Sequence, residues 1–262
     1  MENFERGSTR KRFGQHFLVD SYAIDEIIHA TDPHPGEHII EIGPGEGVLT
    51  GQLVASGAGL LAIEIDRDLA AKLTRRFAEA ANFRLHNGDV LKFDFGALPA
   101  VPDGWKVVGN LPYNISTPLI MLLLAHTMTF SRMVVMVQRE VAARMAAVEG
   151  SHAYGRLSVM VQRRCSIRSI LDIGPDSFRP PPKVDSSVIE LVPHGQLLDE
   201  QFERWLGDVV RFAFSARRKT VANAMRGQVD AAAFAAAGID PGTRAEQLSV
   251  KDFVRLAEVT RR

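Results

Sequence analysis

Five short apolar runs recur along the first 150 residues, and stretches with helical spacing of apolar residues separate them. The runs lie at 38–42, 60–65, 83–86, 106–109 and 133–137. Buried strands that alternate with helices are typical of βαβ units, in which the helices cover a parallel sheet. We therefore predict an α/β fold with a Rossmann-like, mostly parallel sheet of seven strands, the last two coming later in the chain.

Capping residues mark where the intervening helices begin. Asp20 precedes a helix that carries Ile24, Ile27 and Ile28, and Asp66 precedes another at 69–80. An aspartate at this position accepts hydrogen bonds from the exposed N–H groups of the first turn. Further helices are predicted at 117–126 and 139–148.

The second part of the chain changes character near residue 194. The segments 165–173 and 184–192 are predicted to pair antiparallel at the sheet edge, on either side of the proline run 180–182. After Pro193 the pattern is helical, at 199–214, 217–225, 231–237 and 249–261, the last capped by Ser249. We therefore predict a catalytic domain over 1–194 and a small all-α domain over 195–262.

A glycine loop follows the first strand in the sequence Glu41-Ile42-Gly43-Pro44-Gly45-Glu46-Gly47. Glycines allow a loop to approach a ligand closely, because no Cβ stands in the way. The spacing differs from the dinucleotide fingerprint, and no Lys-Ser/Thr pair follows as in a P-loop. Acidic residues in the loop disfavour a pyrophosphate, whereas S-adenosylmethionine carries a sulfonium and no phosphate.

Acidic residues also stand at the ends of the next two strands. Glu64 ends the second strand and can accept both ribose hydroxyls, and Asp89 follows the third and can accept from an adenine amine. Open parallel sheets bind ligands at the carboxyl ends of their strands. Gly43, Gly45, Glu64 and Asp89 are therefore predicted to bind S-adenosylmethionine.

The fourth strand ends in Asn110-Leu111-Pro112-Tyr113, an arrangement suited to methylating an exocyclic base amine. The Asn110 amide oxygen and the Leu111 carbonyl can accept from the two N–H bonds of such an amine. Pro112 fixes the turn and removes a competing donor. Tyr113 offers a ring for a base taken out of its stack. These four residues are predicted to form the catalytic motif.

The charge is zero overall but unevenly spread. Residues 1–150 carry 14 Lys and Arg against 18 Asp and Glu, and residues 151–262 carry 17 against 13. The run Arg217-Arg218-Lys219 is predicted to begin a helix capped by Ser215. With Arg10-Lys11-Arg12, it favours contact with nucleic-acid phosphates over a merely solvated surface.

Several classes of protein are disfavoured. The single cysteine, Cys165, excludes an internal disulfide and a cysteine-based zinc site, and favours a reducing, intracellular setting. No secretory signal is expected, and the longest apolar run, 119–125, is too short to span a bilayer. Pro35 and Gly36 prevent a helical metal site at His34 and His38, so no metal is expected.

From about Arg10 to Arg255 the chain resembles the bacterial small-subunit (16S) rRNA adenine N6,N6-dimethyltransferases, a family of class I S-adenosylmethionine enzymes. The segments that carry the resemblance are 11–18, 41–47, 110–116 with 138–140, 178–184 and 214–220.

The resemblance implies that Gln15, His16, Leu18, Gly43, Glu64, Asp89 and Asn110 contact the cofactor. It also implies that the basic segment 1–19 folds over the cofactor. Many members have Asn where this chain has His16, although histidine can still donate a hydrogen bond. Phe178 would lie against the flipped base with Tyr113, unless it only anchors its loop.

The family's reaction adds two methyl groups to N6 of each of two adjacent adenosines near the 3′ end of 16S rRNA. The implied substrate is a nearly complete small (30S) ribosomal subunit, methylated late in its biogenesis. A cytoplasmic monomer is expected.

Three alternatives remain open on the sequence. One is a large-subunit rRNA adenine methyltransferase of the antibiotic-resistance type, which the segments 178–184 and 217–220 disfavour. The second is an RNA-binding assembly factor with a vestigial site, which is disfavoured by the intact residues Asn110, Tyr113, Glu64 and Asp89. The third is DNA adenine methylation, for which no target-recognition insertion is visible.

Overall fold

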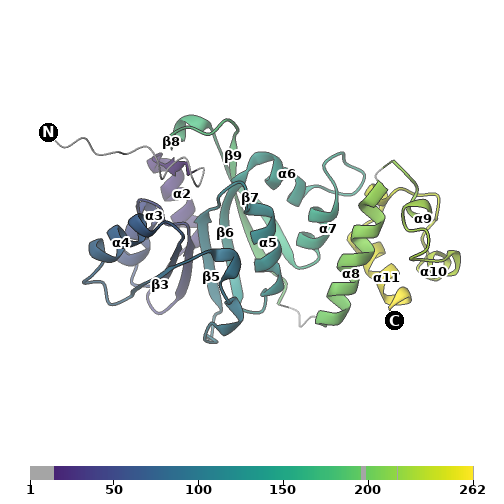
Figure 1. Ribbon diagram of the computed structural model, residues 1–262, viewed down its shortest axis with the longest axis horizontal. Coiled ribbons are helices and arrows are strands. Elements are labelled where there is room, and N and C mark those ends of the chain that lie inside the picture. The colour runs from purple at the N-terminus through teal and green to yellow at the C-terminus, as the bar shows by residue number, and fades with distance from the viewer. Residues whose placement is uncertain (1–14, 196–198, 217, 262) are drawn as a thin grey trace. The chain divides into compact units, whose positions relative to one another are not determined.

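The computed structural model describes residues 15–195, 199–216 and 218–261, and separates the chain into two compact units (Figure 1). The first unit comprises Met1–Ala142 and Ile167–Gly195, and the second comprises Ala143–Ser166 and Gln196–Arg262. The boundary predicted from the sequence lies at residue 194, whereas the structure also groups Ala143–Ser166 with the C-terminal helices.

A seven-stranded sheet in the order β4-β3-β2-β5-β6-β9-β7 forms the centre of the first unit. The strands are β2 (His38–Ile42), β3 (Gly59–Glu64), β4 (Phe83–Asn87), β5 (Trp105–Asn110), β6 (Phe130–Gln138), β7 (Cys165–Ile173) and β9 (Ser186–Pro193). The first five are mutually parallel, and β9 runs antiparallel to β6. The sheet is therefore mostly parallel, and the predicted fold class is confirmed.

Helices cover both faces of this sheet, because its central strands are apolar on both sides. Ile39, Val108 and Met136 pack with α2 (Ser21–Thr31) and α3 (Val48–Ala55) in one buried cluster. The alternate residues Ile40, Val107 and Val135 are also fully buried, and they point to the other face. The remaining elements flanking the sheet are α4 (Arg67–Arg76), η1 (Val90–Lys92), η2 (Phe95–Ala97), α5 (Ser116–Ala125) and α6 (Arg139–Ala146).

The predicted N-caps are confirmed at two of these helices. Asp20 accepts from the N–H groups of Tyr22 and Ala23 at the start of α2, and Asp66 accepts from those of Asp68 and Leu69 at α4. Helix α4 begins at Arg67, two residues before the predicted start.

A second sheet of two strands joins residues far apart in the sequence. Strand β1 (Phe17–Leu18) pairs antiparallel with β8 (Phe178–Arg179), which follows η3 (Pro175–Ser177). The Ser177 hydroxyl donates to Asp20 at 2.7 Å, which ties the same two segments together. The pairing fixes the chain just before α2 against the proline-rich segment.

The second unit is helical. It contains α7 (Arg156–Gln162), α8 (Glu200–Ala213), η4 (Phe214–Ala216), α9 (Val221–Ala224), α10 (Ala231–Ala236), η5 (Ala245–Gln247) and α11 (Val250–Thr260). Buried Glu203 of α8 forms ion pairs with Arg163 at 3.0 Å and Arg164 at 3.3 Å. These two arginines directly follow α7, so the ion pairs join the segment Ala143–Ser166 to α8.

The predicted helix at 217–225 is wrong in its extent. Helix α9 begins only at Val221, because Thr220 is extended and bridges to Arg244. Ser215 lies within η4 and donates to the Phe212 carbonyl instead of capping a helix. Ser249, in contrast, caps α11 as predicted.

Candidate active site

A pocket opens at the carboxyl ends of β2, β3, β4 and β5. Its lining residues come from four parts of the first unit, at 15–18, 41–46 with 48–49, 63–65 with 88–91, and 110–115. The structure thus brings together every predicted cofactor residue and the motif Asn110–Tyr113.

The glycine loop lies too close to β1 and α4 to carry a side chain at two of its glycines. Gly43, Gly45 and Gly47 all have positive φ, a backbone conformation that favours glycine. A Cβ on Gly45 would lie 3.0 Å from the Phe17 ring, and one on Gly47 would lie 2.7 Å from Leu73. At Gly45 and Gly47 the loop therefore leaves no room for a side chain.

Glu64 is buried at the end of β3 with both oxygens held by the backbone. Oε2 accepts from the N–H of Gly45 at 3.1 Å and Oε1 from that of Asp66 at 2.9 Å. Burial raises the pKa of Glu64, and these two bonds counteract the rise. Each carboxylate oxygen has a second lone pair, so the fixed group can still accept from two hydroxyls of a ligand.

Asp89 lines the same pocket at the end of β4. Its side chain accepts from the N–H of Leu91 at 3.0 Å and so caps the short helix η1. The carboxylate is thereby held in place beside the pocket.

The pocket is acidic. Among the described residues that line it are Glu41, Glu46, Glu64 and Asp89, and none of these lining residues is Lys or Arg. Glu41 is buried and accepts from the Thr50 hydroxyl at 2.7 Å, and burial raises its pKa to about 7. Such a site suits a cationic sulfonium and disfavours a pyrophosphate.

Asn110 is held by residues 15–18, which line the pocket and which we call the strap. Its Nδ2 donates to the backbone carbonyl of His16 at 2.9 Å. Because that partner can only accept, the orientation of the amide is fixed, and Oδ1 is left as the acceptor that a substrate amine requires. Leu111, whose side chain is buried, and Pro112 follow in the pocket wall.

Tyr113 is half-buried, with its hydroxyl 2.6 Å from that of Ser186 at the start of β9. Its ring is stacked with that of His16, with 5.9 Å between the centroids and 23° between the planes. Burial raises the pKa of the Tyr113 hydroxyl.

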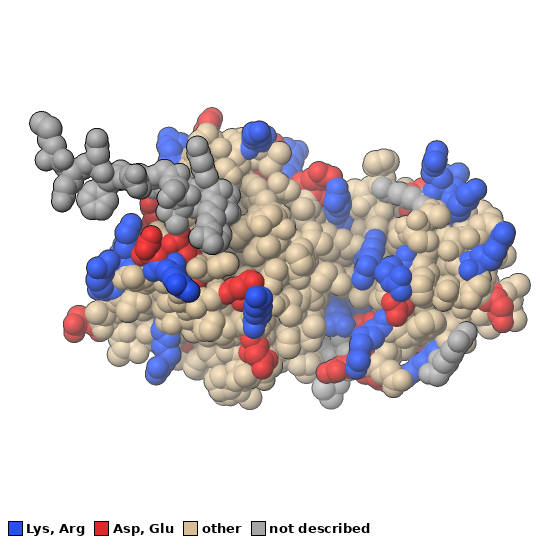
Figure 2. Space-filling model, viewed as in Figure 1, with Lys and Arg blue, Asp and Glu red and all other residues tan. Residues whose placement is uncertain are grey.

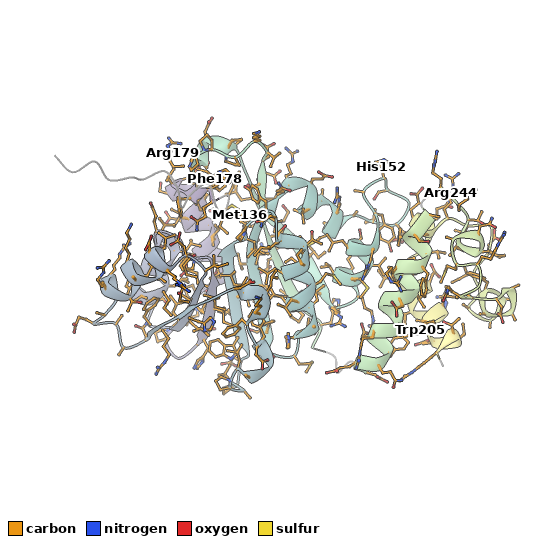
Figure 3. The ribbon with its side chains drawn as sticks, viewed as in Figure 1. Met136, His152, Phe178, Arg179, Trp205 and Arg244 are labelled. Atoms are coloured by element: carbon orange, nitrogen blue, oxygen red, sulfur yellow. The ribbon has the colours of Figure 1, made fainter. Side chains whose placement is uncertain are left out.

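Phe178 does not line the pocket. Its side chain is fully buried in the cluster that contains Leu18, Met136 and Val188. Figure 3 shows Phe178 and Met136 inside the unit, next to the outward-lying Arg179. The expectation that the Phe178 ring faces the base is corrected, because the ring anchors β8 to the core instead.

The predicted RNA-binding residues are only partly described. Arg10, Lys11, Arg12 and Arg217 lie outside the described residues, whereas Arg218 and Lys219 are exposed. The Thr220–Arg244 bridge brings exposed Arg244 beside them, and Arg226 reaches Asn223, which bonds to Thr220. We call Arg218, Lys219, Arg226 and Arg244 the basic patch. Figure 2 shows blue side chains gathered over this part of the second unit.

Some residues of the site have no signal in the sequence. Ser186 lies in an alternating strand, and Thr50 lies inside an apolar helix. Their contacts with Tyr113 and Glu41 depend on how β9 and α3 pack. Of the two pairs, the sequence signals only Glu41, by its place before the glycine loop, and Tyr113, by its place after a strand.

The described residues contain no group of three or more His, Cys, Asp or Glu side chains that could hold a metal ion. No helix in the described ranges is long and apolar enough to cross a membrane.

A mostly parallel sheet of this order, with an acidic pocket at its carboxyl edge, belongs to a class I S-adenosylmethionine-dependent methyltransferase. The profile of the family described as ribosomal RNA adenine dimethylase matches residues 6–262. The chain therefore belongs to the ribosomal RNA adenine dimethylase family, and S-adenosylmethionine is its methyl donor.

Individual relatives agree with this assignment. Proteins named Ribosomal RNA small subunit methyltransferase A, from Pseudomonas putida and Methylococcus capsulatus, are 52% and 50% identical to this chain. The matches cover 95% of this chain in both cases, and 94% and 96% of the relatives.

Solved structures are similar as well. The dimethyladenosine transferase from Plasmodium falciparum superposes with a TM-score of 0.78 at 28% identity, over 92% of this chain and 96% of that one. The 23S rRNA methyltransferase ErmE gives 0.71 at 25% identity, over 94% and 100%.

Proposed function

We propose that this enzyme transfers methyl groups from S-adenosylmethionine to N6 of two adjacent adenosines near the 3′ end of 16S rRNA. The product is N6,N6-dimethyladenosine in the small (30S) subunit, formed late in its biogenesis by a cytoplasmic monomer. The observation that carries the proposal is the fixed amide of Asn110 at the rim of an acidic pocket. The relatives named above support the choice of subunit.

The cofactor would be held by the residues that line the pocket. Glu64 would accept from the ribose hydroxyls and Asp89 from the adenine amine. The backbone of Gly43 and Gly45 would lie against the ligand. Gln15, His16 and Leu18 would cover it from the strap. The acidic walls would stabilise the positive charge of the sulfonium, which supplies the methyl group.

The protein's own contribution to the transfer would be orientation and polarisation. Asn110 Oδ1 and the Leu111 carbonyl would accept from the two N–H bonds of the target amine, which draws its lone pair out of conjugation with the ring. The amine nitrogen would then form the new N–C bond as the C–S bond breaks, and the proton would leave from the alkylated amine. Preorganised acceptors of this kind need no reorganisation during the reaction.

The Asn110→Ala variant tests this assignment. We expect binding of S-adenosylmethionine within about twofold of the wild type, and a fall in kcat of roughly 100-fold or more, by analogy with the loss of one preorganised polar group. Asn110→Asp is the matched control, because it keeps an acceptor but replaces the donor to His16 by a charged carboxylate oxygen. Undiminished transfer by Asn110→Ala would refute the role of the amide.

The substrate is tested with radiolabelled S-adenosylmethionine and small subunits that lack the modification. Digestion of the rRNA and identification of the labelled nucleoside should give N6,N6-dimethyladenosine in 16S rRNA. Label in large-subunit RNA would favour the second candidate, which rests on the similarity to ErmE. An absence of label in any RNA would contradict both.

A further inference from the structure

We infer that the loop between α6 and α7, residues 147–155, contacts an unpaired rRNA base beside the basic patch. The inference rests on the proposed function and deepens it, because it assigns a part of the second unit to reading the RNA. The starting observation is that the backbone N–H of Gly150 donates to the carbonyl of Glu246 at 2.7 Å. Glu246 lies two residues after Arg244 of the basic patch, and the loop and the patch belong to the same unit. Figure 3 shows His152 and Arg244 along one edge of that unit.

The backbone of the loop is held on both sides of its tip, residues 148–152. Before the tip, the Ala147 carbonyl accepts from the Gln162 side chain of α7 at 2.7 Å. After it, the Tyr154 side chain is fully buried. Within the tip, the N–H and the hydroxyl of Ser151 both donate to the Val148 carbonyl. The tip therefore presents its side chains from a fixed backbone, which lowers the entropy lost when a partner binds.

The tip carries three exposed side chains of different character. Val148 is 65% exposed, and Glu149 and His152 are exposed as well. The space beside them is open, since a Cβ on Gly150 would meet no atom within 4 Å. The tip thus offers an apolar group, a carboxylate and an imidazole to a partner.

These groups suit a base better than a phosphate. The loop contains no Lys or Arg, whereas the basic patch beside it supplies cations for phosphates. Unstacked RNA bases stack on histidine rings, and a carboxylate accepts from the amine of a base such as cytosine. Phosphate contacts position a nucleic acid, and base contacts specify it. Next to the basic patch, His152 would be the stacking surface and Glu149 the acceptor.

The charge of Glu149 makes the inference sharply testable. A carboxylate that only lies in solvent beside a polyanion repels it, so its removal would strengthen binding. A carboxylate that accepts from a base amine leaves that amine unpaired when it is removed, so binding weakens. The sign of the change in affinity separates the two cases.

The test measures how the full-length protein binds small subunits that lack the modification. We expect His152→Ala to raise the dissociation constant roughly 5- to 100-fold, in line with the loss of one stacked base. His152→Phe is the matched variant that keeps a ring, and it should recover most of this loss. Glu149→Ala should raise the dissociation constant about fivefold or more. The log–log salt slope of His152→Ala should equal that of the wild type, because no phosphate contact is lost.

Binding of S-adenosylmethionine serves as the control for folding. No residue of the loop lines the cofactor pocket, so the dissociation constant for the cofactor should stay within about twofold in all three variants. Wild-type affinity of His152→Ala for small subunits would overturn the stacking role, and so would a reduced salt slope. Tighter binding by Glu149→Ala would overturn its role as an acceptor.

The outcomes also separate this inference from the function on which it rests. Variants that bind as the wild type does, to subunits that the wild type methylates, would overturn this inference alone. A wild-type protein that transfers no methyl group to small subunits would overturn the proposed function, and this inference with it.

Discussion

The hydroxyl groups of Tyr113 and Ser186 form one bond that fixes a wall of the site. Ser186 is fully buried, and the oxygens are 2.6 Å apart. Removing either partner leaves the other without its bond, which costs about 1–3 kcal/mol, whereas removing both leaves nothing unsatisfied. We expect Tyr113→Phe and Ser186→Ala each to lower the free energy of unfolding by about 1 kcal/mol or more, and the double variant to lose no more than the worse single one.

Urea unfolding of the four proteins gives this interaction energy. Strictly additive losses would mean that the bond contributes nothing of its own. If the bond also orients the ring, kcat should fall in both single variants while binding of S-adenosylmethionine is unchanged. Cofactor affinity that falls in step with kcat would instead indicate a general disturbance of the pocket.

The catalytic and cofactor residues differ in how far the sequence alone predicts them. The positions of Glu64, Asp89 and Asn110 could be predicted, because Glu64 and Asn110 end recognisable strands, Asp89 closely follows one, and parallel strands end at one edge. Phe178 could not, because the same Phe-Arg-Pro sequence suits a base platform or a core anchor. Only the packing of β8 against the core decides between them.

At the scale of elements, the contact between β5 and β2 determines where Asn110 lies. Gly109 is the residue before Asn110, and a Cβ there would lie 2.3 Å from the backbone oxygen of Ile42. That neighbour is a strand backbone and cannot move aside cheaply. The glycine therefore allows the two central strands to come together at the edge that carries the site.

We expect Gly109→Ala to lower the free energy of unfolding by about 2–3 kcal/mol, within the range for overpacked cores. It should also weaken binding of S-adenosylmethionine, because the strand ends separate. Gly174→Ala is the control, since its φ is −77° and no atom lies within 4 Å of its added Cβ. Chemical denaturation and equilibrium dialysis measure the two effects. Equal free energies of unfolding of the two variants would show that the sheet accommodates the methyl group added at position 109 without cost.

Elements with a long periodic pattern were predictable, and short ones that depend on distant partners were not. The strand at 38–42 and the caps Asp20 and Ser249 are where the pattern places them. Strand β1 has two residues, too few to show a period, and exists because β8 pairs with it. The predicted helix at 217–225 is shortened because Thr220 bridges to Arg244, 24 positions away.

At the scale of the whole molecule, acidic and basic functions are divided between the two units. The first unit holds the acidic pocket, which attracts a cation and repels phosphate. The basic patch lies in the second unit, and in the described part of the chain its four residues form no ion pair with Asp or Glu. The uneven charge of the two halves could be predicted from the sequence. That positive side chains gather beside Arg244 could not, because the Thr220–Arg244 bridge brings them together.

We propose that the basic patch contacts rRNA phosphates. Replacing Arg218 and Lys219 by alanine should weaken subunit binding, more strongly at 50 mM than at 300 mM salt, and should lower the log–log salt slope by about 1.5–2. Replacing Arg204 and Arg211 together by alanine is the charge-matched control, since these two side chains are ion-paired within α8, with Glu200 and Asp208. Filter binding across a salt series measures the slope. A loss of affinity that is the same at every salt concentration would argue against phosphate contact.

The buried carboxyl of Glu41 makes the stability of the whole fold depend on pH. Its pKa is raised to about 7 by burial, so the folded state holds this proton more tightly than the unfolded state. With an unfolded pKa near 4.3, stability falls as the pH rises from about 4 to 7, by an amount on the order of 3 kcal/mol.

Glu41→Gln removes the ionisation and keeps an acceptor for Thr50. In the absence of cofactor, we expect the free energy of unfolding of the variant to rise by about 3 kcal/mol relative to that of the wild type between pH 4 and pH 8. The buried amide adds a difference that is the same at every pH. Urea unfolding at four pH values measures this gain, and parallel curves for the two proteins would show that Glu41 ionises as readily in the fold as outside it.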